Sequence, residues 1–165
     1  MKKNTIIFDP TLTVVNLPAA SRTEALEILV KPLLKRGYVT DRYFQQVIQR
    51  EDEFPTGLIF KHITVALPHA NPEDVLQSAC VIGRCQEFVP FGSMEAPDKD
   101  IPVELILVLA LNDSDAHLTM LSKLMDLFSD EEQVESIRSA TNREELCKIF
   151  TDTFWLQDLE MEERQ

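Results

Sequence analysis

The chain has 165 residues, of which 44% are hydrophobic, enough for one domain with a single core, so wholesale disorder is not expected. Its 28 acidic and 16 basic residues give a net charge of −12, and such a surface repels nucleic acids and anionic lipids. No apolar run approaches the roughly 20 residues of a membrane span, and no signal peptide is expected. The composition therefore indicates a cytoplasmic protein without nucleic acid binding or membrane insertion, whose acidity serves solubility or a basic partner.

The first part of the chain predicts a short strand and a helix. Residues 11–16 are expected to form the strand. Ser21 followed by Glu24 is a capping-box pattern that opens a helix, and Gly37 is expected at its C-terminal cap. The apolar side of this helix contains Ala25, Leu26, Ile28, Leu29, Leu33 and Leu34.

A second helix is expected to begin at a cap formed by Thr40 or Asp41 and to end before Pro55. Its apolar residues recur at helical spacing: Tyr43, Phe44, Val47 and Ile48. Thr56-Gly57 then predicts a turn. Two β-rich runs follow, at 58–60 and 63–67.

The second half begins with a turn or short helix at 71–74 and continues with strands. We expect a strand at 79–84, an edge strand and turn at 88–92, and a central strand at 103–111, the most apolar segment. Helical patterns follow, near 115–128, 131–138 and 142–155.

Interleaved strands and helices predict an α/β fold: a single domain with a small mixed β-sheet of about five strands, flanked by helices. These local patterns leave the strand order open. Cys80 and Cys85 are five residues apart in a predicted strand, so their side chains should lie on opposite faces. Together with Cys147 they are interpreted as free thiols in a reducing compartment.

His69 is the strongest candidate for a functional residue. It follows a predicted strand and Pro68, and functional side chains in α/β folds often lie at the carboxyl ends of strands. Pro68 restricts the backbone around it and should hold the strand exit rigid. Taken alone, a histidine at a strand end is more often an ordinary polar turn residue.

His117 and Arg50 are the two residues that could join His69. His117 lies in the first turn of the helix after the central strand, so the two imidazoles could meet. Arg50 ends the second helix, where a cation is also favoured by the helix dipole alone. If the next loop folds toward His69, the planar guanidinium becomes a phosphate ligand.

Three segments occur in order: Arg-Glu-Asp-Glu-Phe-Pro-Thr-Gly at 50–57, Val-Ala-Leu-Pro-His at 65–69, and Asp-Ala-His-Leu at 115–118. Together they resemble the IIA domain of the fructose–mannitol class of the bacterial phosphotransferase system. The run at 50–57 is similar to galactitol-type members in particular, whereas His117 matches mannitol-like and fructose-like members better. The chain departs from the family pattern at His62, where a small residue is common, and at Ala70, where glycine is frequent.

By this resemblance, residues 1–157 form one IIA type-2 domain, followed by an acidic C-terminal tail at 158–165. The family's reaction implies that His69 accepts a phosphoryl group from phospho-HPr and passes it to a cysteine of the cognate IIB. The IIC permease would be served only indirectly. Arg50 and His117 are assigned to stabilising the phosphoryl group, and Thr56 is expected near it. No cofactor and no metal are expected.

Three alternatives stay open. One is a regulatory IIA that is phosphorylated without a transport role. Another is a zinc-dependent hydrolase built on His62, His69, His117 and carboxylates such as Asp74. In this alternative, however, His62 and His69 are seven residues apart and would face opposite sides of a strand. The last is an interaction domain that has lost the relay.

Overall fold

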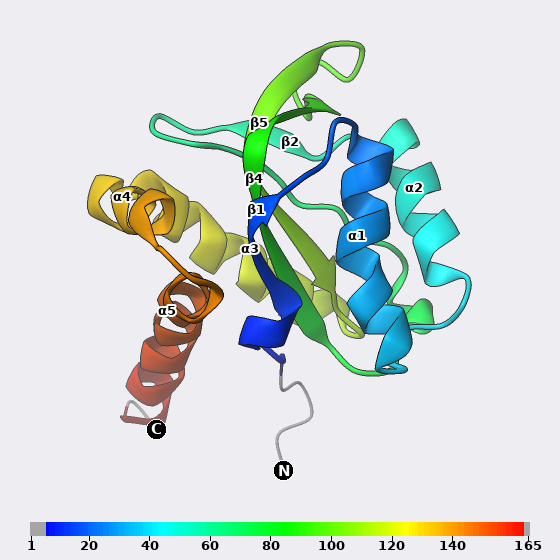
Figure 1. Ribbon diagram of the computed structural model, residues 1–165. Helices are drawn as coiled ribbons and strands as arrows, with labels where there is room; N and C mark the ends of the chain where they lie inside the picture. The colour runs from blue at the N-terminus through cyan, green and yellow to red at the C-terminus, as the bar shows by residue number, and fades with distance from the viewer. Residues whose placement is uncertain (1–5, 164–165) are drawn as a thin grey trace.

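The computed structural model describes the backbone of residues 6–163 and the side chains of residues 6–154. In this part of the chain, a five-stranded mixed sheet lies between two layers of helices (Figure 1). Its order is β1-β4-β5-β3-β2, with β1 (Thr13–Leu17), β2 (Gly57–Ile59), β3 (Thr64–Ala66), β4 (Ala79–Gly92) and β5 (Asp100–Ala110). The predicted α/β class, the single domain and the mixed sheet are confirmed.

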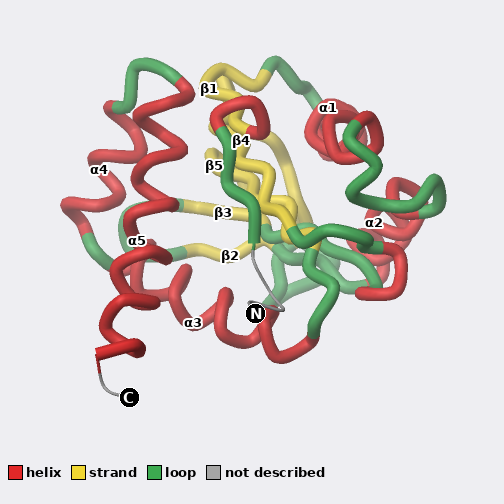
Figure 2. Tube along the Cα trace, turned by 90° about the horizontal axis from the view of Figure 1, so that it is seen from below, coloured by secondary structure: helices red, strands yellow, loops and turns green. Residues whose placement is uncertain are grey.

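Helices cover both faces of this sheet (Figures 1 and 2). On one face lie α1 (Arg22–Lys35) and α2 (Tyr43–Glu53). On the other lie α3 (Ser114–Ser129), α4 (Glu131–Ser139) and α5 (Arg143–Glu163). Two short 3-10 turns, Pro10–Leu12 and Pro72–Asp74, complete the described elements.

Strand β5 supplies both cores. Leu105, Leu107 and Leu109 pack with the α3–α5 layer. Ile106, Val108 and Ala110 point to the opposite face and pack with α1 and α2. A strand segment covered on both faces is apolar on both, which explains the hydrophobic run from Leu105 to Ala110 and confirms the predicted central strand.

The same alternation separates two of the cysteines. Cys80 belongs to the core beneath α3–α5, whereas Cys85 packs on the other core. Cys80, Cys85 and Cys147 are all free thiols. The predicted placement on opposite faces is therefore confirmed.

Helix α1 begins at the predicted capping box. The Glu24 backbone N–H donates to Ser21 Oγ at 3.2 Å, and the Glu24 carboxylate accepts from the Ala20 N–H at 3.2 Å. Gly37 follows the helix with a φ of 70°, a left-handed conformation that glycine adopts without strain. Both predicted ends of this helix are confirmed.

The predicted cap of the second helix is wrong. Arg42 occupies the N-cap position of α2, and no side chain caps the helix there. Thr40 instead donates its hydroxyl to Asp74 Oδ1 at 2.9 Å. A tertiary partner thus takes the hydroxyl that local sequence would use as a cap.

The turn predicted at Thr56-Gly57 is also wrong, because Gly57 is the first residue of β2 and pairs with Ala66. A Cβ atom on Gly57 would lie 2.5 Å from the carbonyl oxygen of Gly92. Glycine is required here by the close approach of two backbones, not by a turn.

The two strands predicted at 79–84 and 88–92 are one strand, β4. It pairs antiparallel with β5 from Ala79↔Ala110 to Gly92↔Asp100. The register shifts between Arg84 and Val89, so an irregularity in the ladder separates the two predicted segments without ending the strand.

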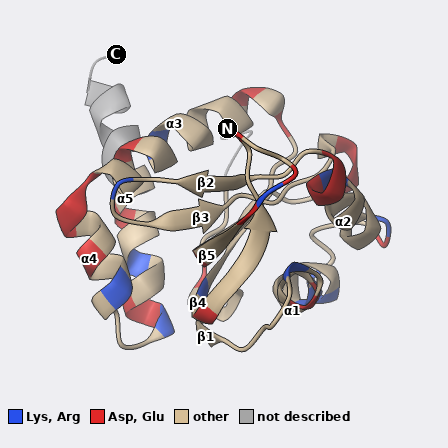
Figure 3. Cartoon of the chain, turned by 90° about the horizontal axis from the view of Figure 1, so that it is seen from above, with Lys and Arg blue, Asp and Glu red and all other residues tan. Residues whose placement is uncertain are grey.

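Charged residues lie mainly on helices and loops, and strands β2 and β3 carry none (Figure 3). None of the described helices combines the length and the apolarity that crossing a bilayer requires.

The strand order places three segments at the same end of the sheet, where β3 and β5 have their carboxyl ends. Because β3 and β5 are parallel neighbours, the loop after β3 and the start of α3 after β5 lie together. Strand β2 is antiparallel to β3, so the first residue of β2 lies at this end of the sheet as well. The C-terminal end of α2, just before β2, therefore reaches the same place.

Candidate functional site

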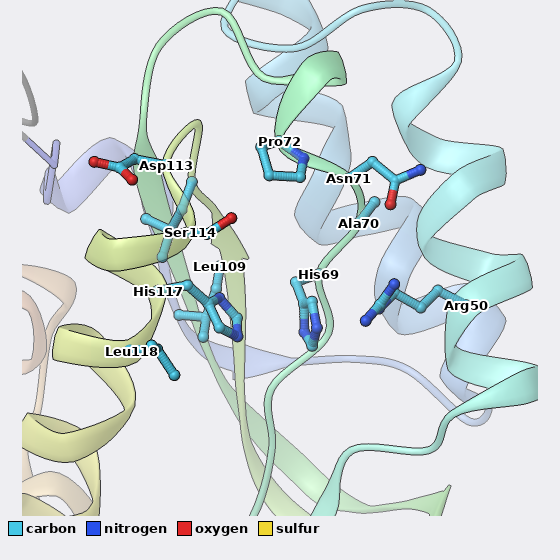
Figure 4. Close-up of a pocket in the computed structure, with 11 residues that line it drawn as sticks. Arg50, His69, Ala70, Asn71, Pro72, Leu109, Asp113, Ser114, His117 and Leu118 are labelled. Atoms are coloured by element: carbon cyan, nitrogen blue, oxygen red, sulfur yellow. The ribbon is translucent and has the colours of Figure 1, made fainter.

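A pocket of about 380 Å³ opens at the carboxyl end of β3 and β5 (Figure 4). Its walls come from the end of α2, the loop after β3, the end of β5 and the first turn of α3. The predicted residues Arg50, His69 and His117 all line it. The structure therefore brings together three of the four residues that the sequence singles out.

His69 lies between His117 and Arg50 (Figure 4). Its Nδ1 atom is 2.9 Å from the carbonyl oxygen of Leu67. A carbonyl only accepts, so Nδ1 carries the proton and Nε2 keeps its lone pair. Burial lowers the pKa of His69 to about 4, against the hydrogen bond to Leu67 and with help from His117 and Arg50. The imidazole is therefore neutral and nucleophilic at neutral pH.

His117 is the second imidazole of the pocket. Its ring centroid is 4.6 Å from that of His69, and the two rings are inclined by 52°. Burial, followed by the charge of Arg50, lowers the pKa of His117. Two neutral rings next to one guanidinium leave Arg50 as the cation of the site.

Arg50 points toward His69 from the last turn of α2 (Figure 4). Its guanidinium carbon lies 5.7 Å from the centroid of the Phe54 ring, a cation–π distance. Its Nε atom is buried and has no hydrogen-bond partner among the described residues. A buried donor of this kind is costly without an acceptor, so this side chain is suited to receive an anion.

Thr56 does not line the pocket. Its hydroxyl donates to Glu51 Oε1 at 2.8 Å and accepts from the Leu67 N–H at 3.0 Å. The hydroxyl is buried one layer behind His69, which binds the carbonyl of the same Leu67.

His62 lies apart from the pocket, in the turn between β2 and β3, where its carbonyl accepts from Arg138. Among the described residues, no group of three or more His, Cys, Asp and Glu side chains could hold a metal ion. The side chains required for the zinc alternative are therefore not assembled in this part of the chain.

Sequence reasoning missed several residues of the site. Asn71, Asp113 and Ser114 line the pocket. Asp113 is the N-cap of α3, and its carboxylate accepts from the Asp115 N–H at 2.9 Å. The cap pattern at 112–115 was the available signal, since a helix start beside a strand end often faces a ligand. The burial of Glu51 was also missed, because Glu51 begins an acidic run, and such runs are typical of exposed surfaces.

The pocket is suited to an anionic group that reacts with His69. It combines one nucleophilic nitrogen, one guanidinium, a second imidazole and the first turn of a 16-residue helix, whose dipole favours negative charge. Phosphoryl transfer needs mainly such positioning and charge stabilisation.

Known proteins with similar sequences are IIA components. The mannitol-specific phosphotransferase enzyme IIA component of Staphylococcus aureus is 31% identical over 141 residues, which is 84% of this chain and 90% of that protein. The galactitol-specific EIIA component of Escherichia coli K12 is 29% identical over 116 residues, which is 70% of this chain and 77% of that protein.

Solved structures of similar fold point the same way. The complex of enzyme IIAMTL and phosphorylated enzyme IIBMTL from Escherichia coli matches with a TM-score of 0.72 and 25% identity, over 90% of this chain and 99% of that one. The nitrogen regulatory protein IIA-Ntr of Neisseria meningitidis matches with a TM-score of 0.67 and 28% identity, over 86% and 94%.

Residues 6–153 match the family described as "Phosphoenolpyruvate-dependent sugar phosphotransferase system, EIIA 2". This match covers nearly all of the described chain and includes every residue of the pocket. The protein belongs to this family of sugar phosphotransferase IIA components.

Proposed function

We propose that this protein is a phosphocarrier that accepts a phosphoryl group from phospho-HPr on His69 and donates it to a cysteine of a cognate IIB. One observation carries the proposal: His69 Nδ1 donates to the Leu67 carbonyl, leaving a neutral Nε2 in a pocket with Arg50 and His117. Family membership supplies the reaction class.

Each transfer exchanges one bond to phosphorus for another. In the first, a bond forms between His69 Nε2 and phosphorus while the P–N bond to HPr breaks. In the second, that new bond breaks as a P–S bond forms on IIB. Neither step needs a proton on Nε2, and the Nδ1–H bond to Leu67 is compatible with both.

Arg50 and His117 stabilise the phosphoryl oxygens in this proposal. Arg50 provides the permanent charge, and its Nε, which has no hydrogen-bond partner in the described part of the chain, provides a donor. His117, in its neutral form, donates one N–H from the other side of His69. His117 is expected to matter most in the second step, when the phosphoryl group is transferred to IIB.

Two exposed apolar side chains flank the pocket and suit transient partner docking. Leu118 is 67% exposed beside His117, and Phe54 is 63% exposed beside Arg50. Leu67 is buried in the core, and Leu121 is partly buried and packs against the same core. HPr and IIB would use this rim in turn, in the cytoplasm, and the IIC permease would be reached only through IIB.

A sugar or polyol is the expected cargo of the cognate permease. The run at 50–57 favours a galactitol-like polyol, and the mannitol-specific and galactitol-specific relatives are both polyol systems by name. A regulatory role without transport is the second candidate, favoured by the structural similarity to the nitrogen regulatory protein. Transfer to a IIB separates the two, since a purely regulatory protein has no such acceptor.

Intact-protein mass spectrometry tests the proposal. We expect one added phosphate after incubation with phosphoenolpyruvate, enzyme I and HPr, lost in acid, stable in base and mapped to His69. His69→Ala should abolish it without loss of fold, because the pocket is open to solvent. His62→Ala is the matched control and should label normally, since His62 lies outside the pocket. A normally labelled His69→Ala protein contradicts the assignment.

A further inference from the structure

We propose that Glu51 and Thr56 are positioning residues that hold the Leu67 carbonyl, and through it keep His69 in the tautomer with a free Nε2. This inference deepens the proposed function and rests on it, because it assumes that His69 Nε2 is the reacting atom. Neither residue touches the pocket.

Four hydrogen bonds form an uninterrupted path from α2 to His69. The Glu51 carboxylate accepts from the Thr56 backbone N–H at 2.7 Å and from the Thr56 hydroxyl at 2.8 Å. The same hydroxyl accepts from the Leu67 N–H at 3.0 Å. The Leu67 carbonyl then accepts from His69 Nδ1 at 2.9 Å.

The path up to Leu67 is buried, and a hydrogen bond is stronger where the local dielectric is low. Glu51 is 3% exposed, Thr56 4% and Leu67 2%. Both carboxylate oxygens of Glu51 accept, as expected for an ionised carboxylate, although burial raises its pKa against the two Thr56 donors. The Thr56 hydroxyl has both a donor and an acceptor role filled, so it cannot rotate without losing one of them.

Strand pairing explains why Leu67 needs this support. The ladder between β2 and β3 ends at Gly57↔Ala66, and Pro68 has no N–H to extend it. The Leu67 N–H therefore bonds the side chain of Thr56 in place of a main-chain partner. On the other side, the Pro68 carbonyl accepts from the Leu109 N–H of β5 at 2.9 Å. Leu67 is thus held from two directions.

This arrangement determines which nitrogen of His69 reacts. A carbonyl held at Nδ1 keeps the proton there, and the lone pair stays on Nε2. If the carbonyl could swing away, the proton could move to Nε2 and block that atom. Supporting residues of this kind fix tautomer and ring orientation at metal sites, and the same reasoning applies to a phosphoryl acceptor.

The two ends of the path also lie beside the guanidinium and the nucleophile of the site. Glu51 follows Arg50 directly in α2, and Leu67 lies two residues before His69. The Glu51–Thr56 pair therefore joins the element that carries the guanidinium to the loop that carries the nucleophile. It sets the spacing of these two groups as well as the tautomer.

Three variants test the pair, with Thr64→Val as the matched control. Thr56→Val keeps the shape and removes the hydroxyl, whereas Thr56→Ser keeps the hydroxyl. Glu51→Gln replaces one acceptor oxygen by an amide donor, which cannot accept from Thr56 at both positions. Thr64 also lies in this part of the sheet, but its hydroxyl donates to the Pro102 carbonyl at 2.5 Å, outside the path.

Two readouts are needed for each variant. Nitrogen-15 NMR of the unphosphorylated protein gives the tautomer of His69, and quench-flow labelling from phospho-HPr gives the phosphorylation rate. We expect wild type, Thr56→Ser and Thr64→Val to show one tautomer, with the proton on Nδ1, and similar rates. Thr56→Val and Glu51→Gln should show mixed tautomers and rates lower by about tenfold or more, since small displacements of reacting groups are costly.

A purely structural role predicts a different pattern. If Thr56→Val and Glu51→Gln melt at lower temperature but keep the single Nδ1–H tautomer and the wild-type rate, the inference is wrong. If Thr56→Val does not fold, Glu51→Gln decides by the same two readouts. A wild-type protein that is never phosphorylated overturns the proposed function instead, while the tautomer measurement still tests the pair.

Discussion

His69 owes its expected reactivity to burial, to Leu67 and to the two other groups of the pocket. Burial keeps the ring neutral, and the Leu67 carbonyl selects which nitrogen is free. Arg50 and His117 both disfavour a second positive charge and offer donors to an incoming anion. The same residues thus prepare the nucleophile and receive the phosphoryl group.

The low pKa of His69 predicts a specific pH dependence of stability. An unfolded histidine titrates near pH 6.5, whereas His69 in the folded protein titrates at about 4. Between these values the unfolded state binds a proton that the folded state does not, so the free energy of unfolding falls as pH falls. We expect His69→Gln to lose less stability than wild type between pH 7 and pH 4.5, measured by urea denaturation.

Direct titration checks the same point. The ring NMR signals of His69, assigned by their loss in His69→Gln, should change little from pH 8 to pH 5. Equal pH slopes of stability in the two proteins, or a His69 midpoint at 6.5 or above, would contradict the burial argument.

His117 and Arg50 are expected to affect different steps. His117→Ala should still accept a phosphoryl group but pass it to IIB more slowly, because the ring 4.6 Å from His69 is lost. Arg50→Ala should slow both steps by about 100-fold, the usual effect of removing a donor to a developing charge. Rapid-quench rates of labelling and of discharge measure both, and Arg50→Lys should restore only part of the rate because it lacks the planar fork.

Among the elements, α1 begins at a local side-chain cap, whereas the residues before α2 are held by a tertiary contact. Helix α1 begins at a capping box formed by near neighbours in the sequence, Ser21 and Glu24. Helix α2 has no side-chain cap, and the preceding Thr40 bonds to Asp74 from a distant loop. The N-terminus of α1 is therefore stabilised by residues close in sequence, and the segment before α2 by a residue distant in sequence.

This difference predicts a simple cap effect. Ser21→Ala removes the oxygen that accepts from the Glu24 N–H and should lower the free energy of unfolding by about 1 kcal/mol. Ser122→Ala is the control, because Ser122 is an exposed residue in the middle of α3. Urea denaturation measures both. A Ser21→Ala protein as stable as wild type would show that the box is not needed for α1.

At the scale of the molecule, Arg84 joins the sheet to one helical layer. Its Nη1 donates to the carbonyls of Ile137 at 2.9 Å and Ala140 at 2.7 Å, at the end of α4. Its Nε donates to the carbonyl of Val15 in β1 at 3.1 Å. The side chain of Arg84 thus links β4 to β1 and to the C-terminal end of α4, where a cation is favoured.

Arg84→Met should therefore lower the free energy of unfolding by about 2–3 kcal/mol, because carbonyls of two elements lose a charged donor. Arg143→Met is the control, since Arg143 forms an exposed ion pair with Glu144, and pairs of this kind contribute little to stability. Phosphorylation by phospho-HPr should be unchanged in both folded proteins, because neither arginine lines the pocket. An Arg84→Met protein with control stability would mean that water replaces these bonds.

The features that depend on near neighbours in the chain could be predicted from the sequence. Ser21 and Glu24 predict a helix start, Gly37 its end, and the apolar run at 103–111 a strand buried on both faces. The ordered segments around Arg50, His69 and His117 also identified the family that the match over residues 6–153 shows. These inferences hold because capping, periodicity and motif order are written within short stretches of chain.

Which distant residues meet could not be predicted from the sequence and depends on the fold. The order β1-β4-β5-β3-β2 puts β3 beside β5, which brings His69 to within 4.6 Å of His117 as measured between ring centroids. It also buries Glu51, which an acidic run suggests is exposed, and turns Thr56 away from the pocket toward Leu67. Local propensity says nothing about strand order, and a hydrogen bond between elements exists only once that order has brought its two partners within about 3 Å.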